Sequence, residues 1–268
     1  MANYTAADVK KLREETDAPM MECKAALDEA DGDFTRAKEI LREKGKAAAA
    51  KRVGRSTAAG VVAFSLNADS TVLAGVVVEC ETDFVARNED FIATAQEIAD
   101  IVRDSGEDDA KIKDIVEASV AKIREHIKVA KAVRLTGDGK YLAYVHHDKT
   151  KGAAVAFTGE SHDEAVRKVA IQVVAFPPEV LTKGDLSQEK IEAEIATETK
   201  RAIDEGKPQN IAENIAKGRV NKEFIKQVVL LEQPFYTEPS KSVGQYLAES
   251  AKGSTVTKFV YLAVGQNG

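Results

Sequence analysis

Residues 61–88, VVAFSLNADSTVLAGVVVECETDFVARN, decide the fold. Two apolar runs, 61–66 and 71–79, flank the polar segment Asn-Ala-Asp-Ser, so we expect two strands joined by a turn. Asn88 is a helix-capping residue type, and apolar residues at helical spacing follow it. A strand–turn–strand–helix unit of this kind predicts an α+β fold.

A similar order of elements recurs downstream. The expected elements are a helix near 110–127, strands at 128–135, 141–146 and 153–157, and a helix from a Ser161–Glu164 capping box to Pro177-Pro178. The order strand–turn–strand–helix thus occurs near 61–104 and near 129–176, which indicates two similar subdomains. A last alternating run, 256–264, predicts a strand that returns to an earlier sheet.

Helical patterns flank this region on both sides. Residues 1–45 predict three short helices, the first with a Thr5–Asp8 capping box and the third ended by Gly45. The following segment, 46–60, is rich in Lys, Ala and Arg and is interpreted as a basic linker. Residues 187–229 predict an antiparallel helical hairpin, broken by a Gly-Lys-Pro turn.

Composition narrows the class of protein. The 268 residues are 44% hydrophobic and 31% charged, which indicates a sizeable core and a well-solvated surface. No apolar run of about 18 residues and no secretory leader pattern occurs, so we expect no membrane span. Two cysteines make no disulfide framework and favour a reduced, cytoplasmic setting. The net charge of -6 disfavours direct nucleic-acid binding.

Motifs of phosphate, metal and cofactor sites are missing. The fragment Gly137-Asp138-Gly139-Lys140 lacks the first glycine and the Ser/Thr of a phosphate loop, so we expect a hairpin turn there. None of the four histidines pairs with a cysteine at ligand spacing. We therefore expect no bound metal and no cofactor.

The segment 79–88 raises two questions. Cys80 lies between two glutamates, whose charge suppresses a thiolate, so a structural cysteine is favoured over a nucleophile. Phe84 follows Asp83 between a strand and a helix. It either forms an exposed contact tip or folds back onto the core.

The segment 79–88 also resembles the signature of the elongation factor Ts family. Other segments resemble the same family in the same order: LREETDAPMMECKAAL at 12–27, GKPQNIAE at 206–213, and LLEQPF at 230–235 followed by SKSVG at 240–244. Collinear motifs over nearly the whole chain are more specific than any one of them.

This resemblance implies a domain organisation. An N-terminal three-helix domain of the ubiquitin-associated type, with its linker, would occupy 1–55. Core subdomains of small antiparallel sheets and helices would occupy 56–138 and 139–268. The second would carry the protruding helical hairpin over 183–229. The pattern of helices and strands agrees with this architecture.

The resemblance also implies a function without a catalytic site. In the family, the loop matching Thr82, Asp83, Phe84 and Val85 intrudes into the GTPase domain of elongation factor Tu and displaces its Mg²⁺. GDP then leaves and GTP binds, during the elongation phase of translation. The implied activity is guanine nucleotide exchange.

Further partner contacts are implied at Arg13, Met20, Met21, Lys24 and His146. By its spacing alone, Met20 fits the core as well as a contact surface. The resemblance leaves open whether factor and GTPase assemble one-to-one or two-to-two.

Two departures from the family pattern affect contact details. Asp17-Ala18-Pro19 stands where a glycine-containing turn is usual, and Arg124 stands where glycine is common. Three rival functions stand against this one: a different helical interaction module, an enzyme using Cys80 or His146, and an RNA-binding translation factor. The first leaves the motifs beyond residue 45 unexplained, and the last conflicts with the acidic charge balance.

Overall fold

The computed structural model describes residues 3–16, 18–52, 54–137 and 139–266. The chain divides into two compact units: unit 1 comprises 1–65, 74–134 and 262–268, and unit 2 comprises 66–73 and 135–261. Each unit combines helices with a small sheet, which confirms the predicted α+β class. Within the described ranges, no helix has the length and apolarity needed to cross a membrane.

Three helices begin unit 1: α1 (Ala6–Thr16), α2 (Met20–Glu29) and α3 (Phe34–Ala50). The predicted capping box starts α1, because the Thr5 amide and hydroxyl both donate to Asp8 Oδ2 at 2.7 Å. The Asp8 N–H donates back to Thr5 Oγ1 at 3.3 Å. Buried side chains hold the helices together, among them Leu12, Cys23, Leu27 and Ile40.

The prediction that Gly45 ends the third helix is wrong, because α3 continues to Ala50. Gly45 lies where α3 meets α6 (Ala110–Ile123), and a Cβ at Gly45 would come within 2.9 Å of the Ala121 Cβ. Glycine at this position lets α3 and α6 approach each other closely, and it does not end the helix. α6 ends before the predicted residue 127, because Arg124 adopts the left-handed conformation with φ 65° and ψ 24°.

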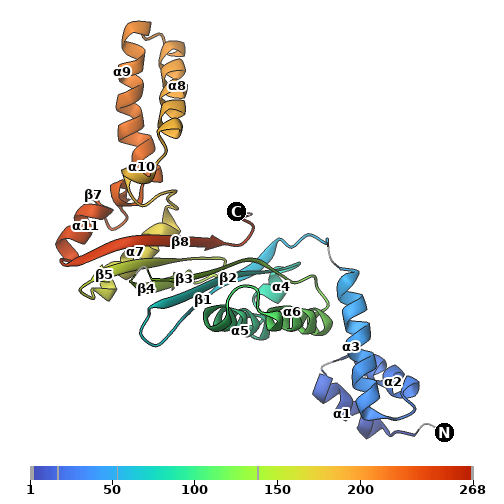
Figure 1. Cartoon of the computed structure of the whole chain (residues 1–268). Coiled ribbons are helices and arrows are strands. Elements are labelled where there is room, and N and C mark those ends of the chain that lie inside the picture. The colour runs from blue at the N-terminus through green and yellow to red at the C-terminus, as the bar shows by residue number, and fades with distance from the viewer. Residues whose placement is uncertain (1–2, 17, 53, 138, 267–268) are drawn as a thin grey trace. The chain divides into compact units, whose positions relative to one another are not determined.

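The sheet of unit 1 has the order β1 (Ala59–Leu66), β2 (Val72–Cys80) and β3 (Lys128–Thr136). The helices α5 (Glu89–Ser105) and α6 lie along one face of this sheet (Figure 1). Apolar side chains fill the space between sheet and helices, among them Val61, Ala74, Val76, Val78, Phe91, Ile98 and Val102. As the central strand, β2 is buried along nearly its whole length.

The sheet of unit 2 has the order β4 (Lys140–Val145), β5 (Lys151–Gly159) and β8 (Ser254–Ala263). β4 and β5 are antiparallel, with Lys140 opposite Phe157 and Val145 opposite Gly152. Because β8 follows all the helices of this unit and pairs with β5, the prediction of a returning last strand is confirmed.

Helices and a short hairpin complete the core of unit 2. They are α7 (Asp163–Ala175), α11 (Val243–Ser250), and the strands β6 (Pro234–Phe235) and β7 (Glu238–Ser242). The Phe235 ring stacks on Tyr246 with 3.8 Å between centroids. The shared core includes Val155, Phe157, Val166, Val169, Val173 and Leu247. None of β6, β7 and α11 was anticipated from the sequence pattern.

Two predictions near β4 and α7 are wrong. β3 and β4 belong to different sheets, so these two strands do not form the predicted hairpin; Asp138 of the predicted turn lies outside the described residues. A Cβ at Gly139 would lie 2.3 Å from the Phe157 carbonyl oxygen, so the close approach of β5 leaves room only for glycine at this position. The Ser161–Glu164 box does not form, because Ser161 donates to Asp163 instead, at 2.6 Å.

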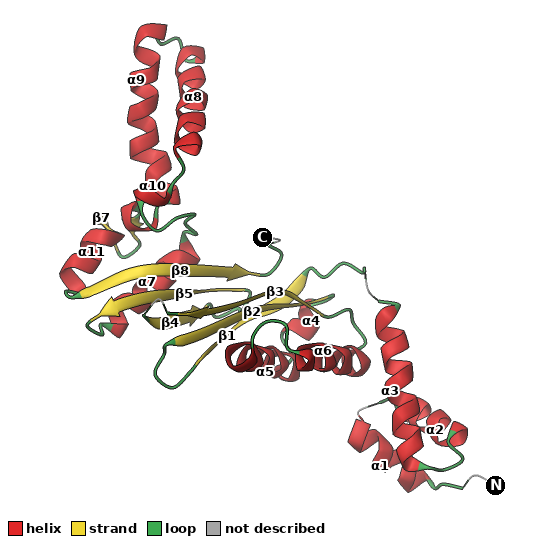
Figure 2. Ribbon diagram, in the orientation of Figure 1, coloured by secondary structure: helices red, strands yellow, loops and turns green. Residues whose placement is uncertain are grey.

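The predicted helical hairpin is confirmed as α8 (Gln188–Asp204) and α9 (Gln209–Arg219), which run antiparallel (Figure 2). Small buried residues let the helices approach: Ala202, Ala212 and Ala216. A π-helical turn, Val220–Phe224, and α10 (Ile225–Val228) extend α9. The 3₁₀ turns Lys183–Asp185 and Leu230–Glu232 precede and follow the hairpin region.

The left-handed residue Arg124 provides a test of backbone strain. Only glycine adopts this conformation freely, and other residues are disfavoured by about 1–2 kcal/mol. Arg124 also pairs with Glu22, but both side chains are partly exposed, so the pair contributes about 1 kcal/mol at most. We expect Arg124→Gly to raise the free energy of unfolding by about 1 kcal/mol, measured by urea denaturation.

Arg124→Ala is the matched control, since it removes the same ion pair and keeps the strain. It should leave the unfolding free energy unchanged or slightly lower. An equal gain in both variants would contradict the assignment of strain to this residue.

Candidate functional site

A one-turn helix follows the buried strand β2. This helix, α4 (Asp83–Ala86), starts at Thr82, whose extended backbone and hydroxyl oxygen cap it by accepting the Val85 N–H at 3.4 Å. Asn88 then caps α5 through the Asp90 N–H at 2.8 Å, as predicted. Two caps so close together force the chain through a single exposed turn between the strand and the long helix.

Phe84 points out of this turn. Its exposed fraction is 84%, whereas Val85 and Ala86 pack against the core between sheet and helices. Of the two alternatives left open by the sequence, the exposed tip is therefore the one observed. Beside the ring, Asp83 and Arg87 form an exposed ion pair at 3.1 Å. A large apolar side chain thus stands at the surface on the same turn as an exposed ion pair.

Cys80 lies beneath this turn and is fully buried. Its thiol donates to the Thr82 carbonyl oxygen at 3.2 Å. Burial, together with the neighbouring Glu125 carboxylate, raises the pKa of Cys80 to about 12. Since nucleophilic attack requires the thiolate, this cysteine is structural at neutral pH.

Two carboxylates lie at the base of the turn: Glu81, from the segment 79–88, and Glu125, which no sequence pattern marks. Glu125 accepts the N–H groups of Glu81 and Thr82, each at 3.0 Å. Glu81 accepts the His126 N–H at 2.6 Å and pairs with Arg55 at 3.4 Å. The His126 N–H, followed by Arg55, lowers the pKa of Glu81. No linear pattern marks the backbone contacts of Glu125 and Glu81, because they join segments more than 40 residues apart.

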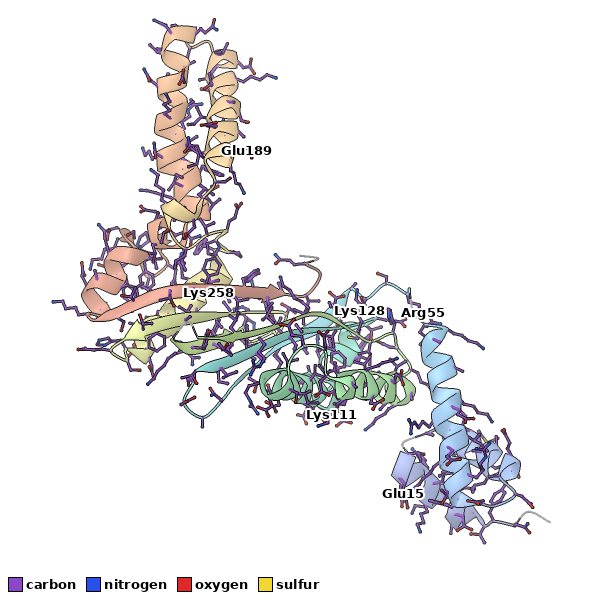
Figure 3. The ribbon with its side chains drawn as sticks, viewed as in Figure 1. Glu15, Arg55, Lys111, Lys128, Glu189 and Lys258 are labelled. Carbon is purple, nitrogen blue, oxygen red and sulfur yellow. The ribbon has the colours of Figure 1, made fainter. Side chains whose placement is uncertain are left out.

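A third carboxylate, Glu79, is buried at the end of β2. It accepts bonds from the Thr57 hydroxyl at 2.8 Å and the Gly265 N–H at 3.1 Å, and it pairs with Lys128 at 3.1 Å. Burial acts to raise the pKa of Glu79, but these three donors outweigh it and leave the pKa lowered. Figure 3 labels Lys128 and Arg55, which reach this end of the sheet from β3 and from the linker after α3.

The contact residues implied in the N-terminal helices are all exposed: Arg13, Met20, Met21 and Lys24. Met20 is 42% and Met21 73% exposed, whereas Cys23 on the same helix is buried in the core. Met20 is therefore a surface residue. The turn before α2 is the one that departs from the family pattern. Its Asp17 lies outside the described residues, and its Pro19 carbonyl oxygen accepts the Glu22 and Cys23 N–H groups.

His146 belongs to unit 2 and follows β4. Its Nδ1 lies 3.0 Å from the Tyr144 hydroxyl, and its ring contacts His147 with 4.3 Å between centroids. Neighbouring Asp148 accepts both the Thr150 N–H and hydroxyl at 3.0 Å, which orders the turn. In the described part of the chain, no three His, Cys, Asp or Glu side chains are grouped to hold a metal ion.

The exposure of Phe84 predicts that stability does not depend on it. We expect Phe84→Ala to change the free energy of unfolding by less than about 0.5 kcal/mol. Phe91→Ala, a matched change at a fully buried ring on α5, should cost about 3–5 kcal/mol. Urea denaturation followed by circular dichroism compares them, and comparable losses would show that Phe84 packs inward in solution.

The environment of Cys80 predicts resistance to alkylation. At pH 8, a pKa near 12 leaves about one thiolate in ten thousand, and burial also blocks the reagent. Iodoacetamide should label Cys80 in urea but not in the folded protein, as read by peptide mass spectrometry. Cys23, equally buried, serves as the internal control. Rapid labelling of folded Cys80 alone would argue for a reactive thiol.

Comparison with known proteins places the chain among its relatives. A family profile described as "Elongation factor TS" matches residues 81–266. Elongation factor Ts of Clostridioides difficile (strain 630) is 40% identical over 286 residues, covering 99% of this chain and 94% of that protein. Elongation factor Ts of Corynebacterium urealyticum is 42% identical over 284 residues, covering 99% and 100%. The chain therefore belongs to the elongation factor Ts family, a family of translation elongation factors.

Proposed function

We propose that this protein is a guanine nucleotide exchange factor for the GTPase elongation factor Tu. It binds the GDP-bound GTPase, displaces the Mg²⁺ of that GTPase, and promotes GDP release so that GTP can bind. The observation that carries the proposal is the 84% exposed ring of Phe84 on a capped, anchored turn. Family membership supports the choice of partner.

The turn has the properties of a wedge. Thr82 caps it and Val85 anchors it, so Phe84 is presented without a long flexible loop. Burying such a ring in an apolar crevice of the partner contributes about 1.5–3 kcal/mol. That free energy drives exchange only if it favours the nucleotide-free GTPase over the GDP-bound GTPase.

Loss of Mg²⁺ explains why a wedge would release GDP. In GTPases, Mg²⁺ bridges and neutralises nucleotide phosphates, so its displacement leaves their charge poorly compensated. The carboxylate of Asp83 belongs to the same tip, where Arg87 pairs with it at 3.1 Å. By linkage, if the factor weakens GDP binding, GDP weakens factor binding equally.

Other exposed residues would contribute to the affinity for the GTPase rather than to the maximal rate of GDP release. Arg13, Met20, Met21 and Lys24 give unit 1 an N-terminal surface of apolar and basic side chains. His146 would add a contact from unit 2. Because these residues are remote from α4 in sequence, their loss should weaken binding without removing the wedge.

The same proposal makes the protein a binding factor without catalysis of its own. The protonated, buried Cys80 offers no nucleophile. The net charge of -6 argues against direct binding to nucleic acid. The protein would act in the cytoplasm, where its partner GTPase serves translation.

The decisive experiment measures GDP release from purified elongation factor Tu. Stopped-flow release of a fluorescent GDP analogue is recorded at several factor concentrations, which separates the maximal rate from the affinity. Changing Asp83 and Phe84 together to Ala should lower the maximal rate about tenfold or more, since each 1.4 kcal/mol is worth a factor of ten. Affinity should fall less.

Ile203→Ala with Asp204→Ala is a matched control, because it removes an adjacent exposed apolar and acidic pair on α8. This control should retain the maximal rate. A wild-type maximal rate in the Asp83/Phe84 variant would falsify the wedge assignment.

A further inference from the structure

Glu125 makes an unusual set of contacts for a residue outside the implied partner surface. It lies between α6 and β3, 43 positions after Thr82 in the sequence. Its Oε2 accepts the N–H groups of Glu81 and Thr82, each at 3.0 Å, and its Oε1 accepts the Thr82 hydroxyl at 2.6 Å. One carboxylate thus binds three donors at the base of α4.

The hydroxyl contact determines how Thr82 caps α4. A threonine hydroxyl has one hydrogen and two lone pairs. Because Thr82 gives its hydrogen to Glu125, a lone pair remains to accept the Val85 N–H at 3.4 Å. Glu125 therefore selects the orientation in which Thr82 caps the helical turn that carries Phe84.

The opposite carboxylate completes the arrangement. Glu81 accepts the His126 N–H at 2.6 Å, so the strand end 81–82 and the turn 125–126 each hold the backbone of the other. The Cys80 thiol donates a hydrogen bond to the Thr82 carbonyl oxygen at 3.2 Å. The amide, hydroxyl and carbonyl of Thr82 are all engaged, and Glu125 provides two of these contacts.

Phe84 depends on this base for its direction. Its 84% exposed ring has little packing of its own, so the turn beneath it, held by the partly buried Val85 and Ala86 and by the Thr82 cap, sets its direction. Charge-assisted bonds to a carboxylate are stronger than neutral ones, so Glu125 holds this base more firmly than a neutral acceptor would. Removal of Glu125 would release both the cap and the end of the strand.

We propose that Glu125 is a positioning residue for nucleotide exchange: it holds Thr82 so that α4 presents Asp83 and Phe84 to the partner GTPase. This inference rests on the proposed exchange function. Glu125 acts through Thr82 and need not touch the partner. Its loss should therefore lower the rate of GDP release at saturating factor, while the half-saturating factor concentration changes little.

The test uses the full chain with Glu125→Ala and Glu125→Gln. The alanine variant should lower the maximal GDP release rate about tenfold, with less than about a twofold change in half-saturating concentration. Glutamine should lose less, about threefold, because its amide oxygen still accepts N–H groups but its NH₂ cannot accept the hydroxyl hydrogen. Glu97→Gln, an exposed change on α5 with the same loss of charge, should match wild type.

A combined variant tests whether Glu125 acts through the wedge. Adding Glu125→Ala to the Asp83/Phe84 double alanine variant should cause no further loss of rate, because residues acting through one element are not additive. A further tenfold loss in that background would overturn the inference. So would a wild-type maximal rate in Glu125→Ala when the wild-type chain itself accelerates release.

Hydrogen exchange of the free protein supplies a readout without the partner. Glu125→Ala should speed amide exchange at Glu81, Thr82 and Val85 at least tenfold, with α5 amides such as Ile98 unchanged. Unchanged exchange at these three amides would overturn the positioning role even if rates fell. If wild-type protein fails to accelerate GDP release, the exchange function is wrong, and accelerated amide exchange would still assign the local contact.

Discussion

The burial of β2 is the constraint on which unit 1 depends. As the central strand it is flanked by β1 and β3, and its Ala74, Val76, Val78 and Cys80 face the core beneath α5 and α6. Gly75 has no room for a side chain, since a Cβ there would lie 2.6 Å from the Phe64 ring. A strand fixed on both faces and both edges ends at a defined point. The exposed turn that follows therefore inherits a defined position, which a loop at a sheet margin would not have.

Local signals in the sequence were sufficient for most of the fold. The Asn88 cap, the Thr5–Asp8 box and the alternating run that became β8 depend on neighbouring residues only, and each was predicted. The errors arose where distant segments decide. Gly45 accommodates Ala121 rather than ending a helix, and Gly139 accommodates the end of β5 rather than closing a hairpin. Glycine occurs both where two segments pack closely and where the chain reverses direction, and a single sequence does not distinguish these two uses.

The candidate site divides in the same way. Physical reasoning identified the acidic, aromatic segment 79–88 but left the direction of Phe84 open, because exposure is a property of the folded chain. The backbone contacts of Glu125 and Glu81 carried no signal, since ordinary glutamates become distinctive only when the base of α4 and the turn before β3 meet. The roles of Asp83, Phe84 and the N-terminal contacts came from family resemblance, because spacing and composition alone do not indicate these roles.

The exposed ring of Phe84 also has a consequence for the free protein in a crowded solution. Every unbound copy of the protein exposes an apolar ring that is available for association with the same ring of another copy. A single ring is far smaller than the several hundred square ångströms typical of self-associating patches. Asp83 and Arg87 form an exposed ion pair on the same turn, so two such tips approaching each other would have to strip water from four charges to bury two rings. The surface is thus selective in a simple sense: only a crevice that already complements both the ring and its charged neighbours gains from burying it.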